Sequence, residues 1–220
     1  MDIKEKKQII VKRIAQSLED GDVVNLGIGM PTLVANYVPE DIDITLQSEN
    51  GFLGLGPKPE EGKEDKDLTN AGGQPVTIKE GGVFFDSAES FAIIRGGHVD
   101  KTVLGALQVD AQGNLANWMI PNKIVPGMGG AMDLVVGAKD VIIATLQTTK
   151  KGNSKILSEC TLPLTAKKQV DYIVTEMGFY KLEASKLILT EINPDYTVEE
   201  VKNATDAELI ISENLKKMSI

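Results

Sequence analysis

The chain has 220 residues, 42% hydrophobic and 25% charged, which suits one large α/β domain or two small ones. Its formal net charge of −9 argues against binding to duplex nucleic acid, and it means that an anionic ligand has to be held by local groups. One cysteine rules out an internal disulfide, the N-terminal residues lack the apolar core of a signal peptide, and no apolar run reaches membrane-spanning length, so we expect a cytoplasmic protein that does not bind membranes.

The N-terminal quarter of the chain predicts two helices and two strands. Isoleucines and leucines recur at helical spacing over residues 3–20. Residues 22–26 form a short apolar run typical of a buried strand, and Pro31 is placed to begin a helix over residues 32–38. Residues 42–46 alternate between apolar and polar side chains, which predicts a strand with one buried face.

The middle of the chain begins with a polar loop over residues 57–75. Two short strands are predicted at residues 76–78 and 83–85, around a glycine turn. A capping-box pattern at Asp86 starts a short helix, and residues 102–109 form the longest candidate for a buried strand.

The C-terminal half predicts more strands than helices. Further apolar runs predict strands at residues 134–136, 141–146, 170–174 and 186–190. Capping boxes at residues 197–200 and 205–208 predict a helical tail. With no repeat or linker, these elements predict one α/β domain over residues 1–220, with a mixed, partly antiparallel sheet flanked by helices.

Glu49 is a candidate for chemistry because of where it lies. It follows a predicted strand and precedes Asn50-Gly51, a pair that favours a sharp turn, and open α/β sheets bind ligands at such strand ends. An ordinary exposed carboxylate in a hairpin turn fits the same local pattern. The triplet recurs at Ser212-Glu213-Asn214 without the glycine, in a predicted helix, where we expect it to be inert.

Two glycine clusters could surround an anion. The Gly27-Ile28-Gly29 turn lies between a strand and a helix start, where amides attract anions, although close strand–helix packing explains the glycines equally well. A second cluster, over residues 126–133, leaves backbone amides accessible and could stabilise an oxyanion, or could be a tight packing turn.

Other catalytic machinery is sparse. With a single histidine and a single cysteine, the chain cannot build a Cys/His zinc site, and it lacks the Gly-x-Ser-x-Gly nucleophile elbow. His98 follows Gly96-Gly97, so we expect it in a turn with a structural hydrogen bond, and Cys160 is expected to be a small, buried or half-buried thiol.

Several motifs together resemble the β (B) subunit of the family I, 3-oxoacid-type CoA-transferases, from about residue 22 to residue 177. They are Gly27-Ile28-Gly29-Met30-Pro31, Ser48-Glu49-Asn50-Gly51, and residues 91–99, 104–109, 115–120 and 127–133. The resemblance implies a fold of the CoA-transferase and ribose-phosphate-isomerase kind. It makes Glu49 the covalent nucleophile. It also implies an active-site loop at Gly129, Gly130 and Ala131, and contacts with substrate or CoA at Asn25, Gly27, Gly29, Asn50, Gly51 and Gln108. Some single-chain members carry a lysine where this chain has Gly73.

The implied activity is ping-pong transfer of CoA between an acyl-CoA and a short-chain carboxylic or 3-oxo acid through a glutamyl-CoA thioester. Acetoacetate with acetate, butyrate or succinate are the implied acids, which belong to short-chain fatty acid and ketone body metabolism. No metal or other cofactor is implied, since CoA is a substrate. The family also implies a separate α (A) subunit in an A₂B₂ heterotetramer, so we expect this chain to be inactive alone.

Three alternatives remain. In an acyl-CoA hydrolase, water would take the glutamyl thioester. A sugar-phosphate isomerase of similar fold would need an acid/base pair and a basic phosphate site, and neither is evident beside Glu49. A non-catalytic binding protein of the same fold is disfavoured by the intact Ser-Glu-Asn-Gly motif.

Overall fold

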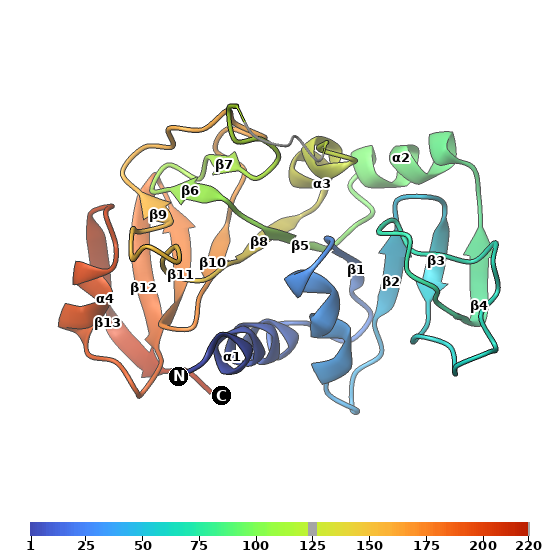
Figure 1. Cartoon of the computed structure of the whole chain (residues 1–220), viewed down its shortest axis with the longest axis horizontal. Coiled ribbons are helices and arrows are strands. Elements are labelled where there is room, and N and C mark those ends of the chain that lie inside the picture. The colour runs from blue at the N-terminus through green and yellow to red at the C-terminus, as the bar shows by residue number, and fades with distance from the viewer. Residues whose placement is uncertain (123–126, 220) are drawn as a thin grey trace.

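A mixed sheet of ten strands organises the molecule in the computed structural model, which describes residues 1–122 and 127–219 (Figure 1). Its strands, in spatial order, are β13 (Leu209–Lys217), β12 (Lys186–Ile192), β11 (Gly178–Glu183), β10 (Tyr172–Val174), β8 (Asp140–Ala144), β5 (Lys101–Gly105), β1 (Val23–Leu26), β2 (Thr45–Ser48), β3 (Phe52–Leu55) and β4 (Ile78–Phe84). The helices are α1 (Ile3–Ala15), α2 (Ser87–Arg95), α3 (Ala131–Gly137), α4 (Val198–Asn203) and the 3-10 helix η1 (Met30–Tyr37). A second sheet holds β7 (Leu115–Ala116), β6 (Gln108–Asp110) and β9 (Ile156–Leu157).

The centre of the large sheet is parallel and its flanks are largely antiparallel. Neighbouring strands from β10 through β8, β5 and β1 to β2 pair in parallel. The hairpins β2–β3, β3–β4, β10–β11 and β11–β12 are antiparallel, and β13 pairs in parallel with β12. The predicted single α/β domain with a mixed, partly antiparallel sheet is therefore confirmed.

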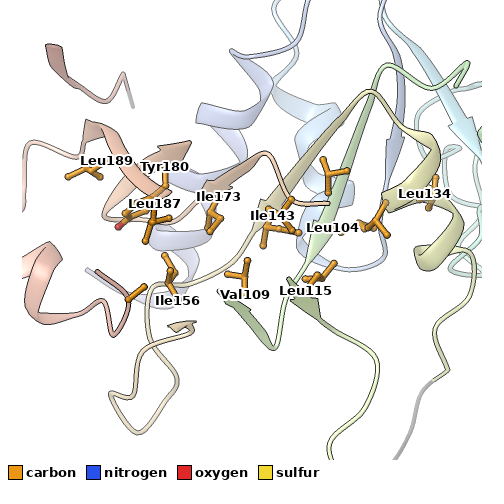
Figure 2. Packing of buried hydrophobic residues seen from close by; sticks show 14 of the residues in the cluster. Leu104, Val109, Leu115, Leu134, Ile143, Ile156, Ile173, Tyr180, Leu187 and Leu189 are labelled. Atoms are coloured by element: carbon orange, nitrogen blue, oxygen red, sulfur yellow. The ribbon is translucent and has the colours of Figure 1, made fainter. Parts of the chain in front are cut away.

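Helices cover both faces of the sheet, which is why its central strands are apolar on both sides. Val103 and Leu104 are consecutive in β5, yet Val103 packs with α1 and η1, whereas Leu104 packs with α2 and α3. In Figure 1, α2 and α3 lie on one side of the sheet and α1 lies on the other. Figure 2 shows how the core that contains Leu104 continues from Leu134 past Ile143 to Leu189.

Three helices begin at side-chain caps, and two of these caps, at Asp86 and Thr197, were predicted from the sequence. Asp2 and Thr197 each form a complete capping box at the start of α1 and α4, and the Asp86 side chain accepts from the Glu89 amide at the start of α2. In the described residues, no helix is both long and apolar enough to cross a membrane.

Two of the predicted strands are wrong. Residues 134–136 belong to α3, where Leu134 is buried and Val136 is 68% exposed, because a run of three apolar residues fits a short helix as well as a strand. Residues 102–109 form parts of two strands in different sheets, β5 and β6, because the chain leaves the large sheet at Ala106.

The two short strands predicted around a glycine turn are one strand, β4. Its pairing with β3 jumps from Leu53↔Val83 to Leu55↔Ile78, and Gly81 has a φ of +83° in the intervening bulge. Glycine therefore bends this strand rather than ending it. The partner strand β3 was not predicted, because it is only four residues long and Gly54 interrupts its apolar residues.

The predicted helical tail is right at residues 197–200, where α4 begins, and wrong after Thr205. The Thr205 hydroxyl donates to the Val201 carbonyl at the end of α4 instead of capping a new helix. The following residues form the edge strand β13, and Leu209 and Ile211 pack against the core. Tertiary pairing with β12 thus overrides a local capping signal, and Glu213 lies exposed in a strand rather than in a helix.

Other element bounds shift by a few residues. Helix α1 ends at Ala15, not at residue 20, since the amides of Ser17 and Leu18 bond only three residues back and tighten the last turn. The segment after Pro31 is a 3-10 helix, and β2 begins at Thr45.

Candidate functional site

A cavity of about 890 Å³ lies where three parallel strands end. Strands β5, β1 and β2 are neighbours, so their carboxyl ends meet at one edge of the sheet. The cavity is lined there by Gly27 after β1, Glu49 after β2 and Ala106 after β5. The chain leaves β1 through η1 on one face of the sheet and enters β8 through α3 on the other face. The cavity therefore lies where the connections change faces, and α/β sheets bind ligands at such points.

The Glu49 carboxylate is held by a backbone amide from a distant loop. The Gly130 amide donates a hydrogen bond of 3.2 Å to Glu49 Oε1. A Cβ atom on Gly130 would overlap the carboxylate, and Gly129 has a φ of +51°, so glycines let this loop approach the carboxylate closely. Pro126, at the start of the predicted glycine cluster, lies outside the described residues.

The turn that carries Glu49 requires glycine at position 51. Gly51 has a φ of +124°, and a Cβ atom there would collide with the Phe85 carbonyl of the segment after β4. The Gly51 amide donates to the Ser48 carbonyl at 3.0 Å and closes the turn between β2 and β3. Glu49 is thus half-buried in a tight hairpin turn, with its side chain directed to the cavity.

Residues on either side of Glu49 attach a loop beside the cavity. The Ser48 hydroxyl accepts from the Ala71 amide at 3.2 Å, and the Asn50 side-chain amide donates to the Thr69 carbonyl at 2.8 Å. The cavity is lined by Asn70, Ala71 and Gly72 of this loop. Gly73 has a φ of +74°, a conformation that favours glycine over the lysine of some single-chain members.

Asn25 and Gly27 reach the cavity from β1. Asn25 is 4% exposed, and its Nδ2 donates to Gln47 Oε1 at 2.6 Å. A Cβ atom on Gly27 would meet the backbone of Val103 and the Leu104 side chain, so close packing also explains this glycine.

The structure brings six of the predicted site residues together and leaves four outside. The cavity is lined by Asn25, Gly27, Glu49, Gly129, Gly130 and Ala131. The residues outside its lining are Gly29, Asn50, Gly51 and Gln108. The Gln108 side chain accepts from the amides of Thr161 and Leu162 at 2.9 Å, so its amide group holds a loop.

The chemistry available in the cavity is that of one carboxylate. Among the described residues that line it, only Glu49 and Lys58 are ionisable. Nowhere in the described parts of the chain do three His, Cys, Asp or Glu side chains gather as a metal site would require. A single carboxylate beside a backbone amide, with Lys58 as the one other ionisable side chain among the described lining residues, suits covalent catalysis better than catalysis by a pair of carboxylates.

The sequence did not identify the residues that hold the Glu49 backbone and pack beside the Gly130 loop. Gln47 and Ser90 form buried hydrogen bonds behind it, and Phe91 packs beside Gly130. Ser90 reads as an ordinary residue of a short helix, so no local signal distinguishes it, and Phe91 is noted only as the first residue of the motif over residues 91–99. Only the position of Gln47 in β2, two residues before Glu49, could have placed it near the site.

His98 and Cys160 lie outside the cavity lining. The His98 side chain is exposed and makes no hydrogen bond within the part of the chain that the structure describes, while its backbone amide donates to the Ile93 carbonyl at 3.2 Å. Cys160 is half-buried, as predicted, and its amide donates to Asp110 Oδ2 at 3.0 Å. Burial and the Asp110 carboxylate raise the pKa of the Cys160 thiol to about 12.

Alkylation of Cys160 by iodoacetamide at pH 8 is expected to be roughly 10²-fold slower than that of an unperturbed thiol, because the thiolate fraction falls by about 10³ and higher nucleophilicity only partly offsets this. A mass-spectrometric time course on the native protein measures the rate. The urea-unfolded chain is the control and should react at the ordinary rate. Native alkylation at that same rate would contradict the burial of the thiol.

Comparison with known proteins identifies relatives of this chain. A family model described as Coenzyme A transferase matches residues 7–204. The β subunit of the acetate CoA-transferase of Haemophilus influenzae is 56% identical over 214 residues, which are 97% of this chain and 96% of that protein. The B subunit of the probable succinyl-CoA:3-ketoacid coenzyme A transferase of Bacillus subtilis is 50% identical over 213 residues, 97% of this chain and 99% of that protein.

A solved structure shares the fold. The acyl-CoA transferase apoenzyme from Escherichia coli O157:H7 superimposes with a TM-score of 0.79 at 22% identity. The superposition covers 97% of this chain but only 43% of that protein, so the chain spans less than half of the solved protein's length.

Proposed function

Because the chain belongs to the coenzyme A transferase family, we propose that it transfers CoA between an acyl-CoA and a short-chain carboxylic or 3-oxo acid through a covalent thioester on Glu49. The observation that carries the proposal is the hydrogen bond from the Gly130 amide to the Glu49 carboxylate at the edge of the cavity. This hydrogen bond places the negative charge of the proposed nucleophile beside an amide donor, and the same donor can stabilise an oxyanion.

In the first half-reaction, a Glu49 carboxylate oxygen attacks the thioester carbonyl carbon of the donor acyl-CoA. The carbon–sulfur bond breaks, CoA leaves as a thiolate, and a mixed anhydride forms between the acyl group and Glu49. The thiolate then attacks the Glu49 carbonyl carbon, which releases the donor acid as a carboxylate and leaves a glutamyl-CoA thioester. An acceptor carboxylate reverses these steps, so the kinetics are ping-pong and no redox or metal cofactor takes part.

The Gly130 amide is suited to the second of these attacks. When the thiolate adds to the Glu49 carbonyl carbon, the negative charge forms on an oxygen of Glu49 itself. Gly130 N already lies 3.2 Å from Oε1, so the donor requires little movement to stabilise that oxyanion. Gly129 and Ala131 shape the loop that aims it.

Acetate and acetoacetate are the acids that we propose first. The Haemophilus relative is named for acetate and the Bacillus relative for succinyl-CoA and a 3-ketoacid, and both share half or more of their residues with this chain over nearly its whole length. This substrate class would place the protein in short-chain fatty acid or ketone body metabolism, in the cytoplasm.

A second polypeptide is part of the proposal. The Haemophilus relative is named as a β subunit, the Bacillus relative is named as a B subunit, and this chain covers 43% of the chain of the solved acyl-CoA transferase. We therefore expect a separate α subunit to complete the site, in a heterotetramer of two α and two β subunits (A₂B₂).

The complex of this chain with its α subunit, incubated with acetoacetyl-CoA without an acceptor acid, should accumulate the Glu49 thioester. Borohydride reduction followed by peptide mapping should find the modification on Glu49, because the thioester waits for an acceptor. Modification of another residue in an active enzyme, or no modification at all, would refute the mechanism.

Two controls accompany this experiment. This chain without its α subunit should give neither the adduct nor transfer, and activity of the chain alone would overturn the proposal of a two-chain enzyme. Consumption of acetoacetyl-CoA measured with and without acetate separates transfer from hydrolysis, since a transferase turns over only with an acceptor, whereas a hydrolase would consume the thioester and release free CoA at the same rate without one.

A further inference from the structure

Ser90, on α2, lies directly behind the proposed nucleophile. Its side chain is fully buried, and its hydroxyl donates to the backbone carbonyl of Glu49 at 2.8 Å. The same hydroxyl accepts from Gln47 Nε2 at 3.1 Å. Ser90 does not line the cavity, so it acts on the site only through its neighbours.

The hydrogen bonds of Ser90 fix the orientation of two amide side chains. A carbonyl oxygen can only accept, so the Ser90 hydroxyl has to use its single proton on Glu49. It must then accept from Gln47, which turns Gln47 Oε1 toward Asn25. Asn25 in turn has to present Nδ2 to Gln47, at 2.6 Å, which sets the direction of its amide beside the cavity.

Helix α2 also contacts the loop that supplies the amide donor. The Phe91 ring lies so close to Gly130 that a Cβ atom there would come within 3.2 Å of it. Arg95 Nε donates to Asp133 Oδ1 at 2.7 Å, which joins α2 to the first turn of α3. One helix therefore holds the backbone of Glu49 through Ser90 and packs against its hydrogen-bond donor through the next residue.

We propose that Ser90 is a positioning residue for Glu49, which fixes the nucleophile's backbone relative to Gly130. The hydroxyl prevents the turn after β2 from rotating and so sets the direction in which the carboxylate enters the cavity. A displacement of about 1 Å in a reacting group can cost on the order of 10²-fold in rate. The inference rests on the proposed function of Glu49.

Ser90→Ala in the complex with the α subunit is expected to lower kcat roughly 10- to 10²-fold, with the KM of each substrate changed by less than about threefold, because the residue does not touch substrate. The single-turnover rate of Glu49 thioester formation should fall by the same factor as kcat. Ser87→Ala, an exposed position on the same helix, is the matched control and should leave all three quantities unchanged.

A purely structural role would give a different result. It would lower the melting temperature or weaken assembly with the α subunit, while the rate per assembled site stayed unchanged. That outcome overturns the proposal, and so does a kcat of Ser90→Ala within twofold of the wild-type value. If Ser90→Ala does not assemble, Ser90→Cys keeps the volume, is a weak donor and is judged by the same criteria. Absence of the adduct in the wild type refutes the Glu49 mechanism itself, whereas a wild-type adduct with an unaffected variant refutes only the role of Ser90.

Discussion

Glu49→Gln is expected to reduce CoA transfer by roughly 10⁴-fold or more, since an amide oxygen carries no charge to attack the thioester and residues that act covalently have effects of this size. The measurement is the rate of acetoacetyl-CoA formation by the complex with the α subunit. The variant should fold normally, because Glu49 is only half-buried and Gln keeps both the side-chain length and an acceptor for the Gly130 amide.

The chain contains its own control for this substitution. Ser212-Glu213-Asn214 repeats the triplet around Glu49, but Glu213 is exposed in the edge strand β13. Glu213→Gln should therefore transfer CoA at the wild-type rate. Comparable losses in the two variants, or a fully active Glu49→Gln, would show that the nucleophile lies elsewhere.

Gly130→Ala is expected to lower kcat by roughly 10²- to 10³-fold, which is the usual cost of losing one oxyanion donor. The added methyl group would overlap the Glu49 carboxylate and also crowd Phe91, so carboxylate and amide would be forced apart. Steady-state kinetics with acetoacetyl-CoA and acetate measure the loss, and the single-turnover rate of adduct formation should fall with it.

Val136→Ala serves as the control for disturbance of α3. This side chain is 68% exposed on the same short helix, away from the cavity lining, so its loss should not change the rate. If Gly130→Ala retained the wild-type kcat, the loop would not supply the oxyanion donor. Melting temperatures of both variants show whether any loss of rate comes from unfolding.

Local features of the chain were sufficient for much of the fold. The capping residues Asp86 and Thr197 predicted the starts of α2 and α4, because a cap depends on residues only three positions apart. The apolar runs that became β1, β8 and β12 predicted strands, because a short apolar run is typical of a buried strand. In the same way, the end of a strand followed by Asn50-Gly51 was enough to place Glu49 at the sheet edge.

Short apolar runs and the tail were decided by tertiary contacts. Residues 134–136 could form a helix or a strand, and their position after the glycine loop made them a helix that packs against α2. The tail carried a capping signal at Thr205, yet pairing with β12 made a strand and packed the partly buried Leu209 and Ile211 against the core. In both cases the local preference was weaker than the apolar surface that the neighbouring elements could bury.

The sequence by itself determined which residue types were available for the chemistry, namely a lone strand-end carboxylate and two glycine clusters with little competing machinery. Only the tertiary structure decided which of them meet. Glu49 and Gly130 are 81 positions apart, and their contact requires the parallel pairing of β1, β2 and β5 and the packing of α2 on α3. The buried chain from Asn25 through Gln47 and Ser90 to Glu49 likewise joins three elements, and hydrogen bonds between distant elements leave no periodicity in the sequence.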